Sequence, residues 1–147
     1  MSVRGSTGSV PVPVPVAIAL ISRGDRFLIR RRPPLPGSPM PGKWEFPGGK
    51  CEPGELPIAC VMREILEEVG LPIVVDRLRR VIDHVYPHGH VRLHFYDCRL
   101  ADLDAEPDPE TGFCWVPCAE LPGLEFPGAN DPIIAELLTE ADAQNSA

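Results

Sequence analysis

Three glutamates, Glu64, Glu67 and Glu68, lie close together in a segment whose pattern is helical. In a helix that begins at Pro57 and stops at Gly70 they occupy positions i, i+3 and i+4, so their side chains converge on one side. Three carboxylates packed so closely repel one another unless something positive lies among them. Clustered oxygen ligands are what Mg²⁺ prefers. The alternative is a solvated acidic helix face, and the helix pattern alone does not decide between the two.

The other side of the same helix is apolar. At 100° per residue, the residues that fall within about 60° of Ile58 are Val61, Met62, Ile65 and Val69. This pattern predicts one stripe that faces a core. Arg63, beside the glutamates, could neutralise one carboxylate and orient it.

The spacing over residues 49–71 is far more specific than the helix pattern. The segment reads Gly49, five residues, Glu55, seven residues, Arg63-Glu64-Ile65, one residue, Glu67-Glu68, one residue, Gly70-Leu71. It resembles the Nudix box at every specified position. The segment from Trp44 to Lys50 is similar to the lead-in of MutT-type members, the 8-oxo-dGTP diphosphatases, and the segment from Phe126 to Pro132 to their base-recognition segment.

The resemblance covers roughly residues 14–140 and implies the Nudix fold, an α/β (α+β) architecture with a mixed β-sheet sandwiched between helices. It also implies Mg²⁺ as the cofactor, with Mn²⁺ as a substitute. The expected metal ligands are the backbone carbonyl of Gly48 and the side chains of Glu64, Glu67 and Glu68, and the residues expected to support them are Glu55 and Arg63.

The resemblance further implies substrate contacts outside the box. Arg31, at the end of a strand, matches an arginine that touches phosphate or sugar, although Arg30 or Arg32 could serve instead. Phe46 and Asn130 are expected to contact the substrate, with Asn130 reading the base edge.

Two positions depart from the family pattern. A substrate arginine of family members falls here at Gly89, where His88, His90 or Arg92 could replace it. The late-loop glutamate has no clean match, since Glu110 is one position out of register and Glu106 further off. The general base is therefore open between Glu68 and Glu110.

The elements that must position these residues are suggested by periodicity and turn signals. Residues 33–43 hold five prolines and two glycines and indicate a long loop. Strands are expected at 16–21, 26–30, 81–85, 90–100 and 113–116, the first two and the third and fourth as hairpins, and helices at 57–70 and 131–140. We divide the chain into a flexible segment 1–13, a Nudix domain 14–141 and a tail 142–147.

Composition limits the alternatives. The net charge of −7 argues against stable nucleic-acid binding and requires a cation or a basic cluster to hold a polyphosphate. No apolar run is long enough for a membrane span or signal peptide, so we expect a cytoplasmic protein. The five cysteines show no paired Cys/His pattern of a zinc site and are expected to be reduced thiols. Nothing in the sequence indicates a protein partner.

The function expected from these observations is hydrolysis of a nucleoside triphosphate, specifically 8-oxo-dGTP, to the monophosphate and pyrophosphate. An alternative is another nucleotide substrate, such as a cytidine triphosphate, a dinucleoside polyphosphate or a nucleotide sugar. A third possibility is a Nudix domain that binds a nucleotide without cutting it, but such a domain is expected to lack box carboxylates, and all are present here.

Overall fold

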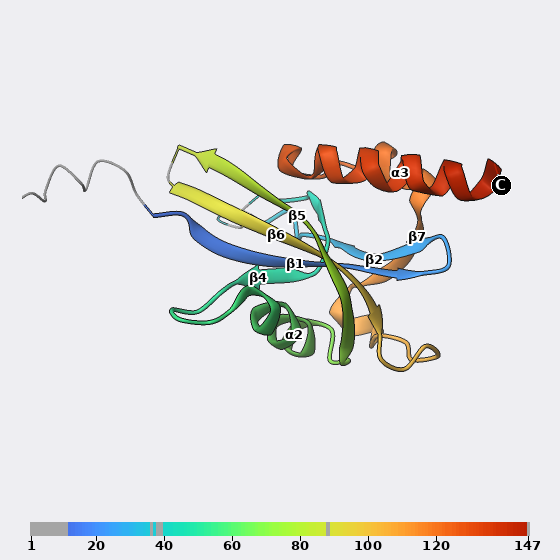
Figure 1. Ribbon diagram of the computed structural model, residues 1–147, viewed down its shortest axis with the longest axis horizontal. Helices are drawn as coiled ribbons and strands as arrows, with labels where there is room; N and C mark the ends of the chain where they lie inside the picture. Colours follow the sequence, from blue (N-terminus) through green and yellow to red (C-terminus); the bar gives the residue numbers. More distant parts are fainter. Residues whose placement is uncertain (1–11, 36, 38–39, 88, 147) are drawn as a thin grey trace, which may run out of the picture.

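A computed structural model describes residues 12–35, 37, 40–87 and 89–146 of the chain. Within this part, two α-helices and a β-sheet account for most of the chain (Figure 1). The strands are β1 (Val14–Arg23), β2 (Arg26–Arg31), β3 (Trp44–Glu45), β4 (Gly48–Lys50), β5 (Ile73–Tyr86), β6 (Gly89–Leu100) and β7 (Cys114–Pro117), and the helices are α2 (Pro57–Glu68) and α3 (Asp131–Ser146). The predicted flexible segment 1–13 lies outside the described residues except for Val12 and Pro13.

Strand β1 is the centre of the sheet. It pairs in parallel with β6, from Val14 opposite Val91 to Ile21 opposite Cys98, and antiparallel with β2 and β4. Strands β3 and β7 extend the sheet beyond β2, and β5 extends it beyond β6. One parallel pair among antiparallel ones makes the sheet mixed, and both predicted hairpins, β1–β2 and β5–β6, are present.

The helices cover opposite faces of the sheet (Figure 1). Alternation along β1 sends Ala17, Ala19 and Ile21 into the core beneath α2, and Leu20 into the core that includes Ile133 of α3. The sheet is therefore sandwiched between helices, which confirms the predicted architecture. Among the described residues, no helix is long and apolar enough to cross a membrane.

Several elements are longer than the sequence predicts, β5 and α3 by the most. Strand β5 begins at Ile73, not near Val81. Its pairing register shifts between Val75 and Arg77 and again between Leu78 and Arg80. Each shift interrupts the two-residue alternation on which the prediction rests. Helix α3 continues past Glu140 to Ser146, so most of the predicted tail is helical. Neither Gly nor Pro interrupts this last stretch, and its alanines favour a helix.

Helix α2 begins at the predicted Pro57 and ends at Glu68, just before Gly70, but part of its predicted core face is exposed. Pro57 stands in its first turn, and Gly70, at φ 79°, donates to the carbonyls of Ile65 and Leu66 beyond its end. However, Ile58 and Met62 are 45% and 48% exposed, so the predicted core stripe is wrong for these two residues. Relative to the predicted core stripe, α2 is turned about its own axis so that the side carrying Glu64 lies closer to the sheet. The residues that the helix buries are Cys60, Val61 and Ile65.

Candidate active site

Glu68, the last residue of helix α2, is hydrogen-bonded to Gly48, the first residue of strand β4. Its Oε1 accepts a hydrogen bond from the backbone N–H of Gly48 at 3.0 Å, and its Oε2 lies 3.4 Å from Nη2 of Arg30. Burial raises the pKa of Glu68 to about 6, although the Gly48 N–H and Arg30 act in the opposite direction. A carboxylate with a pKa close to neutrality is suited to accept a proton from water.

Arg63 holds the other box carboxylates together. Its Nε and Nη2 donate to the two oxygens of Glu55 at 2.8 and 2.9 Å. Its Nη1 donates to Glu64 at 2.9 Å and to Glu67 at 3.2 Å. The hydrogen bonds from Arg63 are the main cause that lowers the pKa of Glu55 to about 2. One guanidinium thus offsets part of the repulsion among the carboxylates, as the sequence suggests for Arg63.

Two adjacent glycines leave room for this arrangement. A Cβ on Gly48 would collide with the backbone carbonyl of Ala17, and a Cβ on Gly49 would collide with the carboxylate of Glu64. The absent side chains let β4 pair with β1 and let Glu64 lie directly against the loop backbone.

The oxygen atoms around this loop fit a hard divalent cation. The side chains of Glu64 and Glu68 are only 17% and 25% exposed, whereas that of Glu67 is 60% exposed. Carboxylates from one helix face therefore meet the Gly48 backbone, which is the kind of oxygen donor set that Mg²⁺ takes. The predicted ligands Gly48, Glu64 and Glu68 lie together, and Glu67 lies at the outer edge.

Gly48 and Gly49 line a cavity of about 440 Å³. Phe46, Leu93 and Asn130 line the same cavity. Phe46 stacks on Phe126 with ring centroids 5.0 Å apart and an interplanar angle of 29°. The lining thus combines charged side chains and the glycine next to Glu64 with aromatic side chains and one buried amide, the mixture that a nucleotide site requires.

Asn130 is buried in the wall of the cavity, with 8% of its surface exposed. Its side-chain amide donates to the carbonyl of Pro127 at 3.1 Å. This bond accounts for one of the two amide N–H groups and fixes the plane of the side chain. Asp131 is the first residue of α3 and has αR backbone angles, so it does not act as the N-cap of this helix.

Three consecutive arginines, Arg30 and Arg31 of β2 and Arg32 directly after it, have different hydrogen-bond partners. Arg31 is exposed and donates to the carbonyl of Gly42 at 3.0 Å. Arg32 lines the cavity and pairs with Glu45 at 2.8 Å. Arg30 bonds both Glu45 and Glu68. Of these three arginines, Arg32 lines the cavity, Arg30 is linked to the carboxylates, and Arg31, the residue expected first to touch substrate, is not among the described residues that line the cavity.

The late-loop glutamates are separated by the structure. The carboxylate of Glu106 accepts hydrogen bonds from Nη1 of Arg23 at 2.6 Å and from the indole N–H of Trp115 at 3.1 Å. Glu110 is exposed in a 3₁₀ turn, and the carbonyl of its neighbour Thr111 accepts a bond from Arg30 at 3.3 Å. Because Arg30 also reaches Glu68, the turn that carries Glu110 is connected to the site, whereas Glu106 is engaged elsewhere.

The hairpin that lacks the family arginine also borders the cavity. Gly89 and His90 line it, whereas Arg92 is held by two hydrogen bonds to Asp83 at 2.7 and 3.0 Å. His88 lies outside the described residues. Sequence reasoning missed Lys50 and Tyr86, which also line the cavity. The signal for Lys50 was its place at the end of the Gly48-Gly49 segment.

Comparison with known proteins agrees with this geometry. The model of the NUDIX domain family matches residues 16–136. The chain is 37% identical over 100 residues to the 8-oxo-dGTP diphosphatase of Escherichia coli K12, an alignment that covers 67% of this chain and 76% of the relative. It is 32% identical over 93 residues to the NAD-capped RNA hydrolase NudC of Stutzerimonas stutzeri, covering 63% of this chain and 32% of that protein.

A solved structure gives the same result for the fold. The MutT protein of methicillin-resistant Staphylococcus aureus 252, a Nudix hydrolase, aligns with a TM-score of 0.71 at 29% identity, over 89% of this chain and 99% of the other. With the box carboxylates gathered on α2 and the family model matching most of its length, this chain belongs to the Nudix hydrolase family.

Proposed function

We propose that the chain hydrolyses 8-oxo-dGTP to 8-oxo-dGMP and pyrophosphate with the help of Mg²⁺. The observation that carries this proposal is the single cavity that joins the glycines beside Glu64 and Glu68 to Asn130 and Phe46. A nucleoside triphosphate needs a cationic or metal-lined end for its phosphates and an aromatic pocket for its base. The similarity to the 8-oxo-dGTP diphosphatase of E. coli supports the same substrate.

Nudix hydrolases generally use a divalent metal, and the donor atoms here suit Mg²⁺. The residues that would hold it are Glu64, Glu67 and Glu68 with the carbonyl of Gly48. When bound, Mg²⁺ offsets negative charge on the phosphate oxygens during the displacement. Mn²⁺ has similar oxygen preferences and is expected to substitute for it.

The chain's own residues supply the remaining steps. Glu68, with a pKa near 6, is largely ionised at neutral pH and accepts a proton from the attacking water. Arg63 keeps Glu64 and Glu67 in place. Arg32, which lines the cavity, attracts the phosphate chain. Glu110, on the turn next to Arg30, remains the second candidate for the base.

A second substrate class has support of its own. The similarity to the NAD-capped RNA hydrolase NudC covers 63% of this chain, and that enzyme is named for action on NAD-capped RNA. The carboxylates and glycines are compatible with a pyrophosphate bond in another nucleotide, so the base end of the cavity must decide between substrates.

A panel of nucleotides tests the proposal, with chromatographic separation of the products for every member and detection of released pyrophosphate for the triphosphates, because NAD, nucleotide sugars and dinucleoside polyphosphates are cleaved to nucleotide and sugar phosphates. The panel contains 8-oxo-dGTP, dGTP, dCTP, a dinucleoside polyphosphate, a nucleotide sugar and NAD. We expect the highest kcat/KM with 8-oxo-dGTP and release of pyrophosphate. Preference for any other member would move the assignment to that class, and binding without hydrolysis of every member would refute catalysis.

A further inference from the structure

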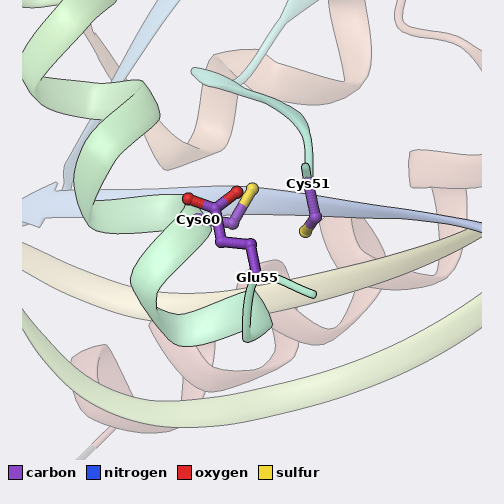
Figure 2. Close-up of side chains that lie close together, drawn as sticks. All are labelled: Cys51, Glu55 and Cys60. Carbon is purple, nitrogen blue, oxygen red and sulfur yellow. The ribbon is translucent and has the colours of Figure 1, made fainter. Parts of the chain in front are cut away.

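A second cluster of metal-ligating groups lies beside the carboxylate site. The Sγ atoms of Cys51 and Cys60 and a carboxylate oxygen of Glu55 all lie within 4.8 Å of one another. Cys51 directly follows β4, Glu55 lies in the loop before α2, and Cys60 is in the first part of α2 (Figure 2). The sequence search for paired Cys/His motifs did not find this group, because its third member is a carboxylate.

The loop holds these groups in place without a ligand. The N–H of Cys51 donates to the carbonyl of Pro15 at 2.9 Å, and the N–H of Glu52 donates to Oε1 of Glu55 at 2.9 Å. Gly54, at φ 78°, allows the tight turn between them. Cys60 is fully buried. Little of the chain would have to move to bring the three ligand atoms around one ion.

A site with two sulfur ligands and one carboxylate oxygen favours a different kind of cation than the site formed by the glutamates on α2 does. Thiolates are soft ligands that favour Zn²⁺ and similar ions, whereas Mg²⁺ takes oxygen ligands. With Zn–S bonds near 2.3 Å, the ligands of a tetrahedral ion lie roughly 3.5–4 Å apart, which is compatible with three ligand atoms that all lie within 4.8 Å of one another. Three protein ligands leave a fourth position for water.

The charges around the cluster also match. Two thiolates, one carboxylate and a divalent cation carry a net charge of −1, and Nη2 of Arg63 lies 3.9 Å from Sγ of Cys60 to compensate it. Burial raises the pKa of the Cys60 thiol, so the cation must displace its proton on binding. Binding should therefore strengthen with rising pH.

We propose that Cys51, Glu55 and Cys60 form a site for a thiophilic divalent cation of the Zn²⁺ class, separate from the oxygen-ligand site of Glu64 and Glu68. Since Glu55 also receives two hydrogen bonds from Arg63, an ion on its carboxylate weakens that pairing. Arg63 in turn touches Glu64 and Glu67. An occupied site should therefore slow hydrolysis, a consequence that rests on the proposed function.

Cobalt spectroscopy tests the site itself. The reduced full-length protein, freed of metal, is titrated with Co²⁺ in excess Mg²⁺, which fills the oxygen-ligand site. We expect about one equivalent of Co²⁺ to produce a thiolate-to-cobalt charge-transfer band that Zn²⁺ removes. Cys51→Ser should weaken binding roughly 10²-fold or more, and Cys114→Ser, at an exposed thiol on β7, should leave it unchanged.

Each outcome decides the proposal. No charge-transfer band in the unmutated protein, or an unchanged band in Cys51→Ser, overturns it. Cys60 is buried, and replacing it can unfold the protein. The test therefore uses a variant of Cys51, which is half-buried. Circular dichroism checks that this variant is folded. Inhibition by Zn²⁺ that is lost in Cys51→Ser supports the coupling to hydrolysis. Equal inhibition of both proteins overturns that coupling but leaves the spectroscopic result standing.

Discussion

Glu68 and Gly48, twenty positions apart in the chain, are joined by a 3.0 Å hydrogen bond from the Gly48 N–H to the Glu68 carboxylate. The bond fixes the carboxyl end of α2 against β4, so that a helix side chain and a loop backbone form one wall. The side chain of Glu68 is accordingly only 25% exposed, whereas that of Glu67, one residue earlier, is 60% exposed. The two carboxylates therefore differ in environment although they are neighbours in sequence.

The dependence on a divalent cation is the first prediction. Excess chelator should abolish hydrolysis, because the clustered carboxylates cannot neutralise phosphate charge without a cation. Addition of Mg²⁺ or Mn²⁺ should restore it, as measured by pyrophosphate release. Full turnover in chelator would contradict the mechanism.

Replacing Glu68 by Gln should reduce turnover roughly 10²–10⁴-fold, since the amide keeps the shape but cannot accept a proton or ligate a cation as strongly. Glu67→Gln should act in the same direction. The matched control is Glu120→Gln, at an exposed position. Steady-state rates and melting temperatures together check the result, and near-full activity of Glu68→Gln at an unchanged melting temperature would show that the assignment is wrong.

The two arginines at the end of β2 should differ in their effects. Arg32→Ala should raise KM roughly 10- to 100-fold, the effect of losing a charge-assisted hydrogen bond to phosphate. Arg31→Ala should change KM little, because its side chain is exposed and bonded to Gly42. A larger effect at Arg31 would favour the original sequence assignment over the placement in the cavity.

The pairing of Glu140 with Arg79 should make the docking of α3 pH-dependent. Arg79 is 6% exposed and donates two 2.7 Å hydrogen bonds to Glu140, which lowers the pKa of that carboxyl. A lowered pKa in the folded state means that the pair stabilises the protein above the unfolded pKa of about 4.3 and that this stability is lost as pH falls through the folded-state pKa.

Glu140→Gln should therefore lower the free energy of unfolding by about 0.5–1 kcal/mol at neutral pH, a small value because half of the carboxylate is exposed. The difference should shrink toward about pH 3, as urea titrations at both pH values would show. Glu120→Gln serves again as the control. A constant difference at both pH values would mean that charge pairing is not its cause.

The sequence was informative where chemistry depends on spacing along one element. The separation of Glu64, Glu67 and Glu68 is a local property, and α2 begins at the predicted Pro57 and ends at Glu68, close to the predicted stop at Gly70. Which side of α2 faces the core, by contrast, depends on contacts with distant segments. Met62 is exposed and Glu64 is mostly covered because Glu64 lies against Gly49, a contact between distant segments that a helical pattern does not contain.

Contacts between distant segments were likewise outside the reach of sequence patterns. Whether Arg31 or Arg32 faces the cavity depends on the phase of β2, and three arginines in a row carry no alternation to reveal it. The cluster of Cys51 with Cys60 depends on how the turn at Gly54 folds back. In both cases the residues were visible in the sequence but their directions were not.

Asn130 should decide the substrate. Guanine presents acceptors at O6 and N7, and oxidation at carbon 8 places a hydrogen on N7, so that the edge becomes acceptor then donor. Since one N–H of the Asn130 amide is held by Pro127, the other N–H and the carbonyl oxygen can meet that edge. With ordinary guanine the amide oxygen would face a lone pair, at a cost of roughly 1–3 kcal/mol in a buried pocket. Asn130→Ala should therefore erase most of the preference for 8-oxo-dGTP over dGTP, measured as the ratio of kcat/KM values, while Mg²⁺ dependence is retained. Equal hydrolysis of the two nucleotides by the unmutated protein would refute this assignment and favour a pyrimidine triphosphate.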